Sequence, residues 1–509
     1  MDFDLAVVGG GINGAGVARS AAYRGYRTVL LEKDDFAQAT SSQSTKMIHG
    51  GIRYLETGDF HLVFEALRER ATLLRIAPNL VKPLQIVIPV YAGSPRPAWK
   101  VRLATLLYDL LAGRRNIGRS HSLSARQIEA LPGLKKEGLR GAIAYHDAQV
   151  FDARLCLETA LSAREAGAVV CNYHPVEKVS FAGSGYRLEG PDLRTGRPFA
   201  FSAKAVCNAT GPWVPFFERA TLAHPTKAMV YDRGIHLVVP SLGLTAGLAL
   251  MCDDGRLMFV LPWQGDYTLI GTTEAEHKGE DFSAVPVSDG EVSYLLDHFN
   301  RFFPARKLTR GEVLHIYSGV RPLVAGQKLA LTKLSREAEI QVFSQAPGTA
   351  WLILYGGKIT SYRALAEQAV KKLARHLEPP PGMPLRDTAT SPLHGGGLMG
   401  EVTNPPDFLT PELQQFWKNR YGSQWVEVAA LALENPDLRE AVVERFGFTR
   451  ADLAYMVTVE LAHTLEDITL RRTKMKYALK PAETRRLARQ LRSMVDSAPP
   501  AVPAGRVAP

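Results

Sequence analysis

The sequence predicts an α/β protein with a Rossmann-like, discontinuous dinucleotide-binding domain, an antiparallel β-sheet substrate domain and an all-α C-terminal domain. Three observations carry this prediction. Glycine turns follow apolar strand patterns at three widely separated points, short β-like runs fill residues 215–340, and helical periodicity dominates residues 411–493. At 509 residues the chain is also too long for one ordinary hydrophobic core, which favours several domains.

The N-terminal residues form a predicted βαβ unit, with strand, helix and strand at 3–8, 12–24 and 28–32. Between the first strand and the helix lies a Gly9-x-Gly11-x-x-Gly14 turn. The first glycine permits the tight turn, the second lets backbone N–H groups approach a pyrophosphate, and the third lets helix and strand pack closely. Glu32, at the end of the next strand, is expected to accept hydrogen bonds from ribose hydroxyls. The unit predicts dinucleotide binding, with FAD and NAD both open.

Two later strand-to-turn patterns predict further pieces of the same domain. One runs through 203–213 into Gly211, and the other through 350–360, where Gly357 and Thr360 precede a helix. The expected boundaries are 1–80, 150–215 and 341–380 for the dinucleotide domain, 81–149 and 216–340 for the substrate domain, 381–400 for a Pro- and Gly-rich linker, 401–495 for the C-terminal helical domain, and 496–509 for a disordered tail.

The stretch from Thr40 to Glu56 favours FAD over NAD, because a nicotinamide enzyme usually continues with βα units here. Small hydroxyl donors and bare glycine backbone suit an extended dinucleotide lying along the chain. A hydrophilic surface loop would explain the serines, but not a histidine and glycines followed by Arg53 and Tyr54. The expected cofactor contacts in this stretch are Thr40, Ser41, Ser42, Ser44, Lys46, His49, Gly50 and Gly51.

Charge and composition narrow the classes of partner. A net charge of +10 and a pI near 9.3 favour a phosphorylated substrate, an acidic membrane surface or nucleic acid. Nucleic acid is not expected, because no basic patch is interleaved with aromatic residues. Four scattered cysteines predict buried thiols in a cytoplasmic protein and no metal site. The N-terminus lacks the pattern of a secretion signal, and no apolar run reaches the roughly 20 residues of a membrane span.

Six stretches in order, "GGGINGAG", "ATSSQSTKMIHGGIRYLE", "NATGPW", "LIGTTE", "YSGVRPL" and "YGGKITSYR", resemble the motifs of FAD-dependent glycerol-3-phosphate dehydrogenase. The resemblance covers about residues 3–380, and "EDITLRRTK" extends it into the C-terminal domain. The family is similar to the D-amino-acid oxidase superfamily, which implies FAD on a three-layer domain with substrate under a β-sheet. It also implies oxidation of sn-glycerol 3-phosphate to dihydroxyacetone phosphate, with electrons passed to a membrane quinone.

A phosphate-bearing substrate requires cations. Arg321 is expected to be the phosphate fork, because guanidinium binds phosphate in a bidentate, planar way, and Arg53 and Arg336 are the next candidates. A solvated surface charge is the alternative interpretation of each arginine, above all of Arg336. Tyr54 is expected to hydrogen-bond the substrate, and Lys358 to place positive charge near the flavin ring and the substrate.

The resemblance implies that His236 is the general base, since a histidine with a pKa near neutrality can accept a proton. A lone histidine in a strand is more often structural. Relatives commonly have lysine, glycine and serine before this histidine, whereas this chain has Arg233, Gly234 and Ile235. The expected catalytic residues are therefore His236, Arg321, Arg53 and Tyr54.

Residues 97–115 combine basic residues and Trp99 with a leucine stripe, which is typical of a helix lying on an anionic bilayer. An ordinary amphipathic helix packed on the protein is an equal alternative. The predicted location is cytoplasmic, peripherally on the inner face of the cell membrane, and a homodimer is one expected assembly. Competing functions are a superfamily enzyme for an amino acid or 2-hydroxy acid, an oxygen-using glycerol-3-phosphate oxidase, and a flavin-binding subunit without turnover.

Overall fold

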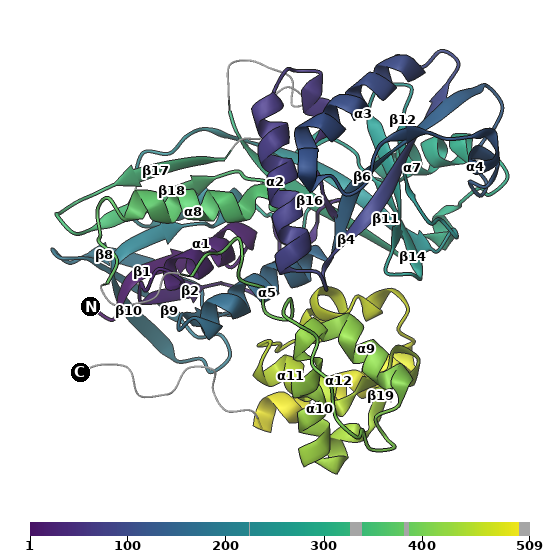
Figure 1. The fold of residues 1–509 in the computed structure, drawn as a ribbon. Coiled ribbons are helices and arrows are strands. Elements are labelled where there is room, and N and C mark those ends of the chain that lie inside the picture. Colours follow the sequence, from purple (N-terminus) through teal and green to yellow (C-terminus); the bar gives the residue numbers. More distant parts are fainter. Residues whose placement is uncertain (223, 326–337, 381–385, 498–509) are drawn as a thin grey trace.

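Two large β-sheets and a helical domain make up the chain (Figure 1). The computed structural model describes residues 1–222, 224–325, 338–380 and 386–497. In Figure 1 the first sheet and its helices lie on the left, the second sheet on the right, and the C-terminal helices below both. The predicted fold class is confirmed by this arrangement.

The first sheet brings together the three strands that precede the glycine turns, β1, β10 and β18. Its order is β17-β18-β10-β1-β2-β7, and all neighbours run parallel except the edge pair β17 and β18. The strands are β1 (Phe3–Val8), β2 (Thr28–Leu31), β7 (Val169–Cys171), β10 (Pro198–Asn208), β17 (Glu339–Phe343) and β18 (Ala350–Tyr355). Segments far apart in sequence therefore end at one edge, where parallel sheets bind ligands.

Alternate residues of β1 face two different cores. Leu5 and Val7 pack toward three helices, whereas Ala6 and Val8 pack toward the β8–β9 hairpin on the opposite face. The covering elements are α1 (Ile12–Ala22), α5 (Asp152–Glu165) and α8 (Tyr362–Leu373) on one side, and β8 (Lys178–Phe181) and β9 (Tyr186–Pro191) on the other. Both faces of the sheet are buried, which explains the continuous apolar pattern of its strands.

The second sheet has the order β15-β11-β14-β13-β12-β4-β6-β3, with β16 on β11 and β5 on β6. Among the described strands of this sheet, β12 and β4 pair in parallel and the other pairs are antiparallel. Its strands are β3 (Met47–Ile48), β4 (Val81–Tyr91), β5 (His121–Ser122), β6 (Leu139–Val150), β11 (Met229–Pro240), β12 (Gly247–Met251), β13 (Leu257–Trp263), β14 (Tyr267–Gly271), β15 (Ala275–Glu276) and β16 (His315–Val324). The predicted antiparallel sheet is thus confirmed.

Helices cover both faces of the second sheet. Leu237 and Val239 of β11 share a core with α7 (Asp289–Phe302), whereas Val238 belongs to the central core that includes α2 (Phe60–Ile76). Helix α3 (Ala98–Ala112) packs beside α2 and β6. The short helix α4 (Ala125–Glu129) completes this half, whereas α6 (Val214–Ala220) packs against β18 of the first sheet.

The C-terminal domain is helical, as predicted, and has a hydrophobic core of its own that includes Trp417, Trp425 and Phe448. Its elements are α9 (Pro411–Tyr421), α10 (Trp425–Glu434), β19 (Ala441–Val443), β20 (Phe448–Thr449), α11 (Arg450–Thr458), a π-helical segment Asp467–Arg472, and α12 (Pro481–Ser497). The first two residues of the predicted tail, 496–509, belong to α12, and the rest lie outside the described residues.

The described part of the predicted linker, 386–400, packs closely against the first domain. The Arg19 guanidinium donates to the carbonyl oxygens of Thr388 and Ser391 at 3.1 and 2.7 Å. The backbone N–H of His394 donates to the Ser162 hydroxyl at 2.8 Å. The segment 386–400 is therefore packed against the first domain although it is rich in Pro and Gly. Glycine permits close approach of the backbone as well as flexibility.

Candidate active site

A cavity of about 740 Å³ lies between the two sheets. One wall comes from the turns after β1, β2, β10 and β18, and the other from β11, β13, β16 and the residues after β14. The stretch 37–57 runs along the cavity between these walls. Among the described residues, no group of three or more His, Cys, Asp or Glu side chains is arranged to hold a metal ion.

The glycine turn has the geometry that a dinucleotide requires. Gly9 has φ of +108°, and a Cβ there would lie 2.5 Å from the Ala209 carbonyl oxygen. A Cβ on Gly14 would lie 1.9 Å from the Gly9 carbonyl oxygen, so Gly14 serves helix packing and does not line the cavity. Gly11 lines the cavity at the N-terminus of α1, where backbone N–H groups and the helix dipole favour an anion.

Glu32 lies beside this turn and lines the cavity. Its carboxylate accepts hydrogen bonds from the backbone N–H groups of Gly10 at 2.5 Å and Asp34 at 2.9 Å. Burial raises the pKa of Glu32 to about 7, and the two backbone donors oppose the rise. A hydroxyl donor arriving in the cavity would meet this carboxylate, which fits the predicted contact with ribose.

Hydroxyls of the stretch 40–45 hold the loop as well as facing the cavity. Thr40 donates to the Val320 carbonyl oxygen at 2.7 Å, and Ser44 donates to Asp152 at 2.7 Å. Ser41 accepts from the backbone N–H of Ile12 at 2.9 Å. Of the predicted contacts in this stretch, those that line the cavity are Thr40, Ser41, Ser44, His49 and Gly51.

Lys46, Ser42 and Gly50 were predicted to bind the cofactor, but the structure places them behind the cavity wall. The Lys46 ammonium is buried, 2.7 Å from the Asp152 carboxylate, and also donates to the Ser42 carbonyl oxygen. Burial lowers the pKa of Lys46, and Asp152 opposes that change. The backbone N–H of Gly50 donates to the Tyr108 hydroxyl at 2.7 Å. These residues hold the loop to α5 and α3 because a buried ammonium needs a carboxylate partner.

The remaining predicted cofactor contacts come from the turns after β10 and β18. Gly211 and Gly357 line the cavity with φ of +63° and +106°. The Thr360 hydroxyl accepts from the backbone N–H of His49 at 3.2 Å, which joins this turn to the stretch 40–51. Lys358 also lines the cavity, and its ammonium lies 4.1 Å from the centre of the Tyr54 ring.

His236 lies on β11, at the other end of the cavity, and is nearly fully buried. Its ring stacks on Tyr317 with centroids 4.9 Å apart, and Nε2 lies 3.0 Å from the Thr45 hydroxyl. Burial first, and then the charges of Lys46 and Arg321, lower the pKa of His236 well below its ordinary value. The expectation of a pKa near neutrality therefore does not hold for this buried histidine, whose imidazole is neutral at pH 7.

Arg321 faces Asp232 across the β11–β16 ladder. One terminal nitrogen donates to Asp232 at 2.5 Å, and the other lies 3.4 Å from the Thr272 hydroxyl. Glu274 also approaches the guanidinium, at 4.0 Å. A substrate anion would therefore meet an arginine that is already held in place by a carboxylate.

Arg53 differs from Arg321 in its surroundings. It belongs to the single turn Ile52–Leu55, which begins after Gly51 at φ of +71°. The side chain is exposed, lines the cavity and has no ion-pair partner among the described residues. Arg336, the third predicted arginine, lies outside the described residues.

Several polar residues that line the cavity were not among the predicted site residues, including Thr45, Arg256, Thr272 and Glu274. Asp232, which pairs with Arg321 but does not line the cavity, was not predicted either. Thr272 and Glu274 belong to "LIGTTE", where two hydroxyl residues and an acid follow a strand. That pattern in the sequence could have predicted them as site residues. Asp232 carried no such signal, because its pairing with Arg321 depends on the register of two distant strands.

Comparisons with known proteins agree with this geometry. Residues 4–363 match the family of FAD dependent oxidoreductases, and residues 348–497 match the C-terminal domain of alpha-glycerophosphate oxidase. The chain is 39% identical to a glycerol-3-phosphate dehydrogenase of Synechocystis sp., over 92% of this chain and 88% of that protein. It is 36% identical to a D-erythritol 1-phosphate dehydrogenase of Brucella abortus, over 94% and 96%.

Among solved structures, the fold is similar to glycerol-3-phosphate dehydrogenase from Bacillus halodurans complexed with FAD. The TM-score is 0.70 at 26% identity, covering 100% of this chain and 97% of that chain. The glycine turn, Glu32 and the stretch 40–51 therefore fit an FAD site on both geometric and comparative grounds.

Proposed function

The chain belongs to the FAD dependent oxidoreductase family, and from this premise we propose that it oxidises sn-glycerol 3-phosphate to dihydroxyacetone phosphate. The observation that carries the proposal is one continuous cavity. It joins a dinucleotide turn to an end lined by Arg53, Arg321, Lys358 and a buried neutral histidine. Cations suit a phosphate group, and a neutral imidazole suits the removal of a hydroxyl proton.

FAD is the cofactor of this family, and the residues present fit it. When bound, FAD supplies the redox chemistry by accepting a hydride from the substrate carbon. The helix α1 N-terminus and Gly11 would hold the pyrophosphate, and Glu32 the ribose. Lys358 and the turn after β18 would place positive charge at the other end of the cofactor.

The substrate phosphate would be held by Arg53, Lys358 and Arg321. Arg53 forms no ion pair with a described carboxylate, whereas Asp232 holds Arg321 in one orientation before the substrate arrives. An oriented guanidinium loses less side-chain entropy on binding. The substrate hydroxyl would then lie near His236, which accepts its proton. The phosphate charge offsets Lys46 and Arg321, so binding would raise the lowered pKa of His236 toward a value useful for a base.

A phosphorylated four-carbon polyol is the second candidate substrate, because a relative with similar identity is named D-erythritol 1-phosphate dehydrogenase. The same cations would serve either phosphate. Amino acids and 2-hydroxy acids fit less well, since one carboxylate offers the cavity cations fewer oxygen acceptors and less negative charge than a phosphate does.

Anaerobic bleaching of the flavin absorbance tests the substrate. The holoenzyme is mixed with glycerol 3-phosphate, D-erythritol 1-phosphate, serine or lactate, and reduction is followed by stopped-flow absorbance. We expect glycerol 3-phosphate to reduce the flavin fastest. Faster reduction by D-erythritol 1-phosphate would favour the second candidate, and reduction by serine or lactate alone would overturn both.

We further propose that electrons pass to a membrane quinone at the inner face of the cell membrane. Helix α3 supports this proposal, because Trp99 and Leu110 are 69% and 76% exposed and basic residues flank the helix. Phe60 and Phe64 of the adjoining helix α2 are exposed as well. An apolar face bordered by cations suits an anionic bilayer surface. No helix in the described part of the chain is long and apolar enough to cross a membrane.

Sedimentation with vesicles tests the membrane contact. The protein should bind phosphatidylglycerol vesicles more tightly than phosphatidylcholine vesicles, and the double variant Leu106→Glu with Leu110→Glu should lose that binding. Leu193→Glu is the control, because Leu193 is 55% exposed but lies outside α2 and α3. Equal binding by all three proteins would rule out α3 as the contact.

The electron acceptor is a separate measurement. Anaerobically reduced enzyme should be reoxidised by a soluble ubiquinone analogue, with little peroxide formed on exposure to air. Rapid peroxide release would instead identify an oxygen-using oxidase. Self-association as a homodimer stays a prediction.

A further inference from the structure

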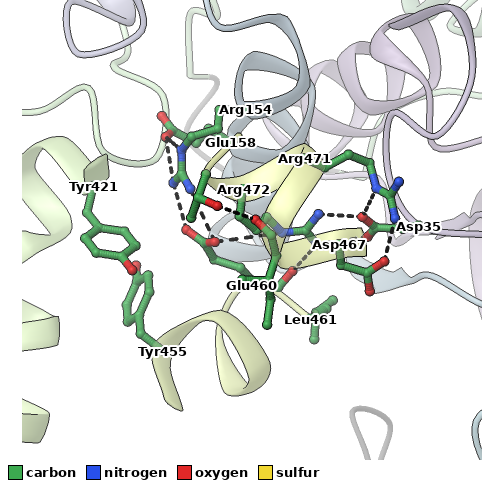
Figure 2. A network of polar contacts seen from close by, with 12 residues as sticks. Asp35, Arg154, Glu158, Tyr421, Tyr455, Glu460, Leu461, Asp467, Arg471 and Arg472 are labelled. Atoms are coloured by element: carbon green, nitrogen blue, oxygen red, sulfur yellow. Dashed lines mark hydrogen bonds and ion pairs between the residues drawn. The ribbon is translucent and has the colours of Figure 1, made fainter. Parts of the chain in front are cut away.

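The C-terminal domain reaches into the first domain through a buried cluster of charges (Figure 2). At its centre is the Asp35 carboxylate, which is fully buried. It accepts hydrogen bonds from Arg472 at 2.5 and 2.8 Å and from Arg471 at 2.5 Å. Burial would raise the pKa of Asp35, but the two arginines outweigh it and lower the pKa to about 2. Asp35 is therefore charged, and both of its cations come from the C-terminal domain.

A second loop of the first domain is held in the same way. The Tyr173 hydroxyl donates to both carboxylate oxygens of Asp467, at 2.8 and 2.9 Å. Beside it, the Asn172 side-chain amide donates to the Leu461 carbonyl oxygen at 2.8 Å and to Asp35 at 3.2 Å. The loops that contain Asp35 and Tyr173 are thus tied to each other and to the C-terminal domain.

Glu460 completes the network. Its carboxylate accepts from Arg154 at 2.7 Å, and its carbonyl oxygen accepts from Arg472 at 2.8 Å. The charged side chains Asp35, Arg154, Glu460 and Arg472 are all nearly or fully buried. Removing one member of such a set leaves an uncompensated charge out of contact with water, which is strongly unfavourable. The domain contact is therefore expected to form or break as a unit.

Both loops line the cavity at the Glu32 end. Residues on either side of Asp35 face the cavity, namely Lys33, Asp34, Ala37 and Gln38, and so do residues 174–176, which follow Tyr173. The loops also bond to each other, because the backbone N–H groups of Tyr173 and His174 donate to the carbonyl oxygens of Asp34 and Glu32 at 2.9 and 2.7 Å. The loops follow β2 and β7, which are neighbours in the first sheet. The C-terminal domain therefore supports the cofactor wall from behind.

We propose that the C-terminal domain retains the cofactor, and that Arg472, Arg471 and Asp467 are positioning residues for FAD that act through Asp35 and Tyr173. Docking of the domain fixes the two loops, and the fixed loops hold the adenosine half of FAD. By linkage, FAD binding strengthens docking by the same factor by which docking strengthens FAD binding. This inference rests on FAD binding alone and is independent of the proposed substrate.

The first test measures FAD release from the full-length holoenzyme without substrate. The variant is Arg472→Met, and release is followed by the fluorescence of free FAD after dilution. Weakened coupling should increase the FAD dissociation constant by about 5- to 150-fold. The control is Arg363→Met, because Arg363 is also a buried arginine, paired with Glu69 at 2.7 Å between α8 and α2, and neither residue lines the cavity. Equal FAD loss from the two variants would overturn the proposal.

Two milder variants keep the test decisive if Arg472→Met fails to fold. Tyr173→Phe removes only the hydroxyl that binds Asp467, and Arg472→Lys retains a cation opposite Asp35. Both should release FAD faster than wild type, by less than Arg472→Met where that variant folds. Wild-type FAD affinity in both would overturn the proposal.

The reciprocal measurement needs no mutation. Hydrogen exchange in residues 460–474 should speed up when FAD is removed from the wild-type protein, whereas exchange in the domain's own core helices α9 and α10 should change less. Unchanged exchange in 460–474 would show that docking and FAD binding are not coupled.

Discussion

The two ends of the cavity are built in opposite ways. The cofactor end takes most of its predicted contacts, the glycine turn, Glu32 and the stretch 40–51, from one continuous N-terminal segment, with Gly211 and Gly357 added from two later turns. The substrate end takes His236, Thr272, Arg321 and Lys358 from separate strands and turns. The conformation of a turn depends on residues that are adjacent in the sequence, whereas an ion pair between two strands depends on the register in which the strands pair. A continuous segment can therefore be interpreted from sequence, but the substrate end needs the fold.

Lys46 lies in the continuous N-terminal segment of the cofactor end, but its side chain stabilises the fold and does not line the cavity. Replacing it therefore tests most strongly which residues of that segment bind the cofactor. Lys46→Met leaves Asp152 buried without its cation, and we expect the free energy of unfolding to fall by about 3–5 kcal/mol. Urea unfolding measures this change. Lys33→Met is the control, because the Lys33 side chain is 43% exposed in its pair with Asp34 and should contribute less than about 1 kcal/mol. If Lys46→Met weakens FAD binding without changing the free energy of unfolding, the sequence-based prediction that Lys46 binds the cofactor would be supported.

Gly14 allows helix α1 to pack closely against the glycine turn, and its substitution tests whether the turn needs this packing. Gly14→Ala forces a methyl group against the Gly9 carbonyl oxygen, and we expect a loss of about 1–3 kcal/mol in unfolding free energy together with weaker FAD binding. Gly141→Ala is the matched control, because nothing lies within 4 Å of a Cβ there. If both variants bind FAD equally well, close helix packing does not shape the turn.

Arg321→Lys tests the substrate end alone. A lysine cannot reproduce the bidentate fork, so KM for glycerol 3-phosphate should rise roughly 10- to 100-fold while FAD stays bound. Steady-state kinetics and flavin absorbance measure the two effects. The control is Arg233→Lys on the same strand as Asp232, because Arg233 pairs with Glu291 and does not line the cavity. Unchanged kinetics would remove Arg321 from the phosphate site.

Glu32 makes the stability of the FAD-free protein depend on pH. The pKa of Glu32 is about 7 in the folded state and near its ordinary value, about 4.3, when unfolded. The folded state therefore binds this proton more tightly, and the resulting stability is full below about pH 4 and lost as pH rises through about 7. Tm should fall between pH 5 and 8 more steeply in wild type than in Glu32→Gln. Parallel curves would mean that the pKa is not raised.

Much of the fold followed from local patterns. The Gly9-x-Gly11-x-x-Gly14 turn after an apolar strand predicted a βαβ unit, because a positive φ at Gly9 and close helix packing at Gly14 restrict those two positions to glycine. The strands before Gly211 and Gly357 were recognisable for the same reason. These strands are parallel neighbours of one sheet, and their wide separation in the sequence follows because parallel neighbours need long connections.

The sequence by itself determined the cofactor turn, the helical C-terminal domain and the residue types available for an anionic substrate. Only the tertiary structure decided which charges face the cavity. Lys46 and Arg321 are both cations near glycines or hydroxyls in sequence, yet Lys46 pairs with Asp152 behind the wall and Arg321 with Asp232 beside the cavity. The physical reason is that a buried charge is stable only beside its partner, and each partner here comes from a distant segment.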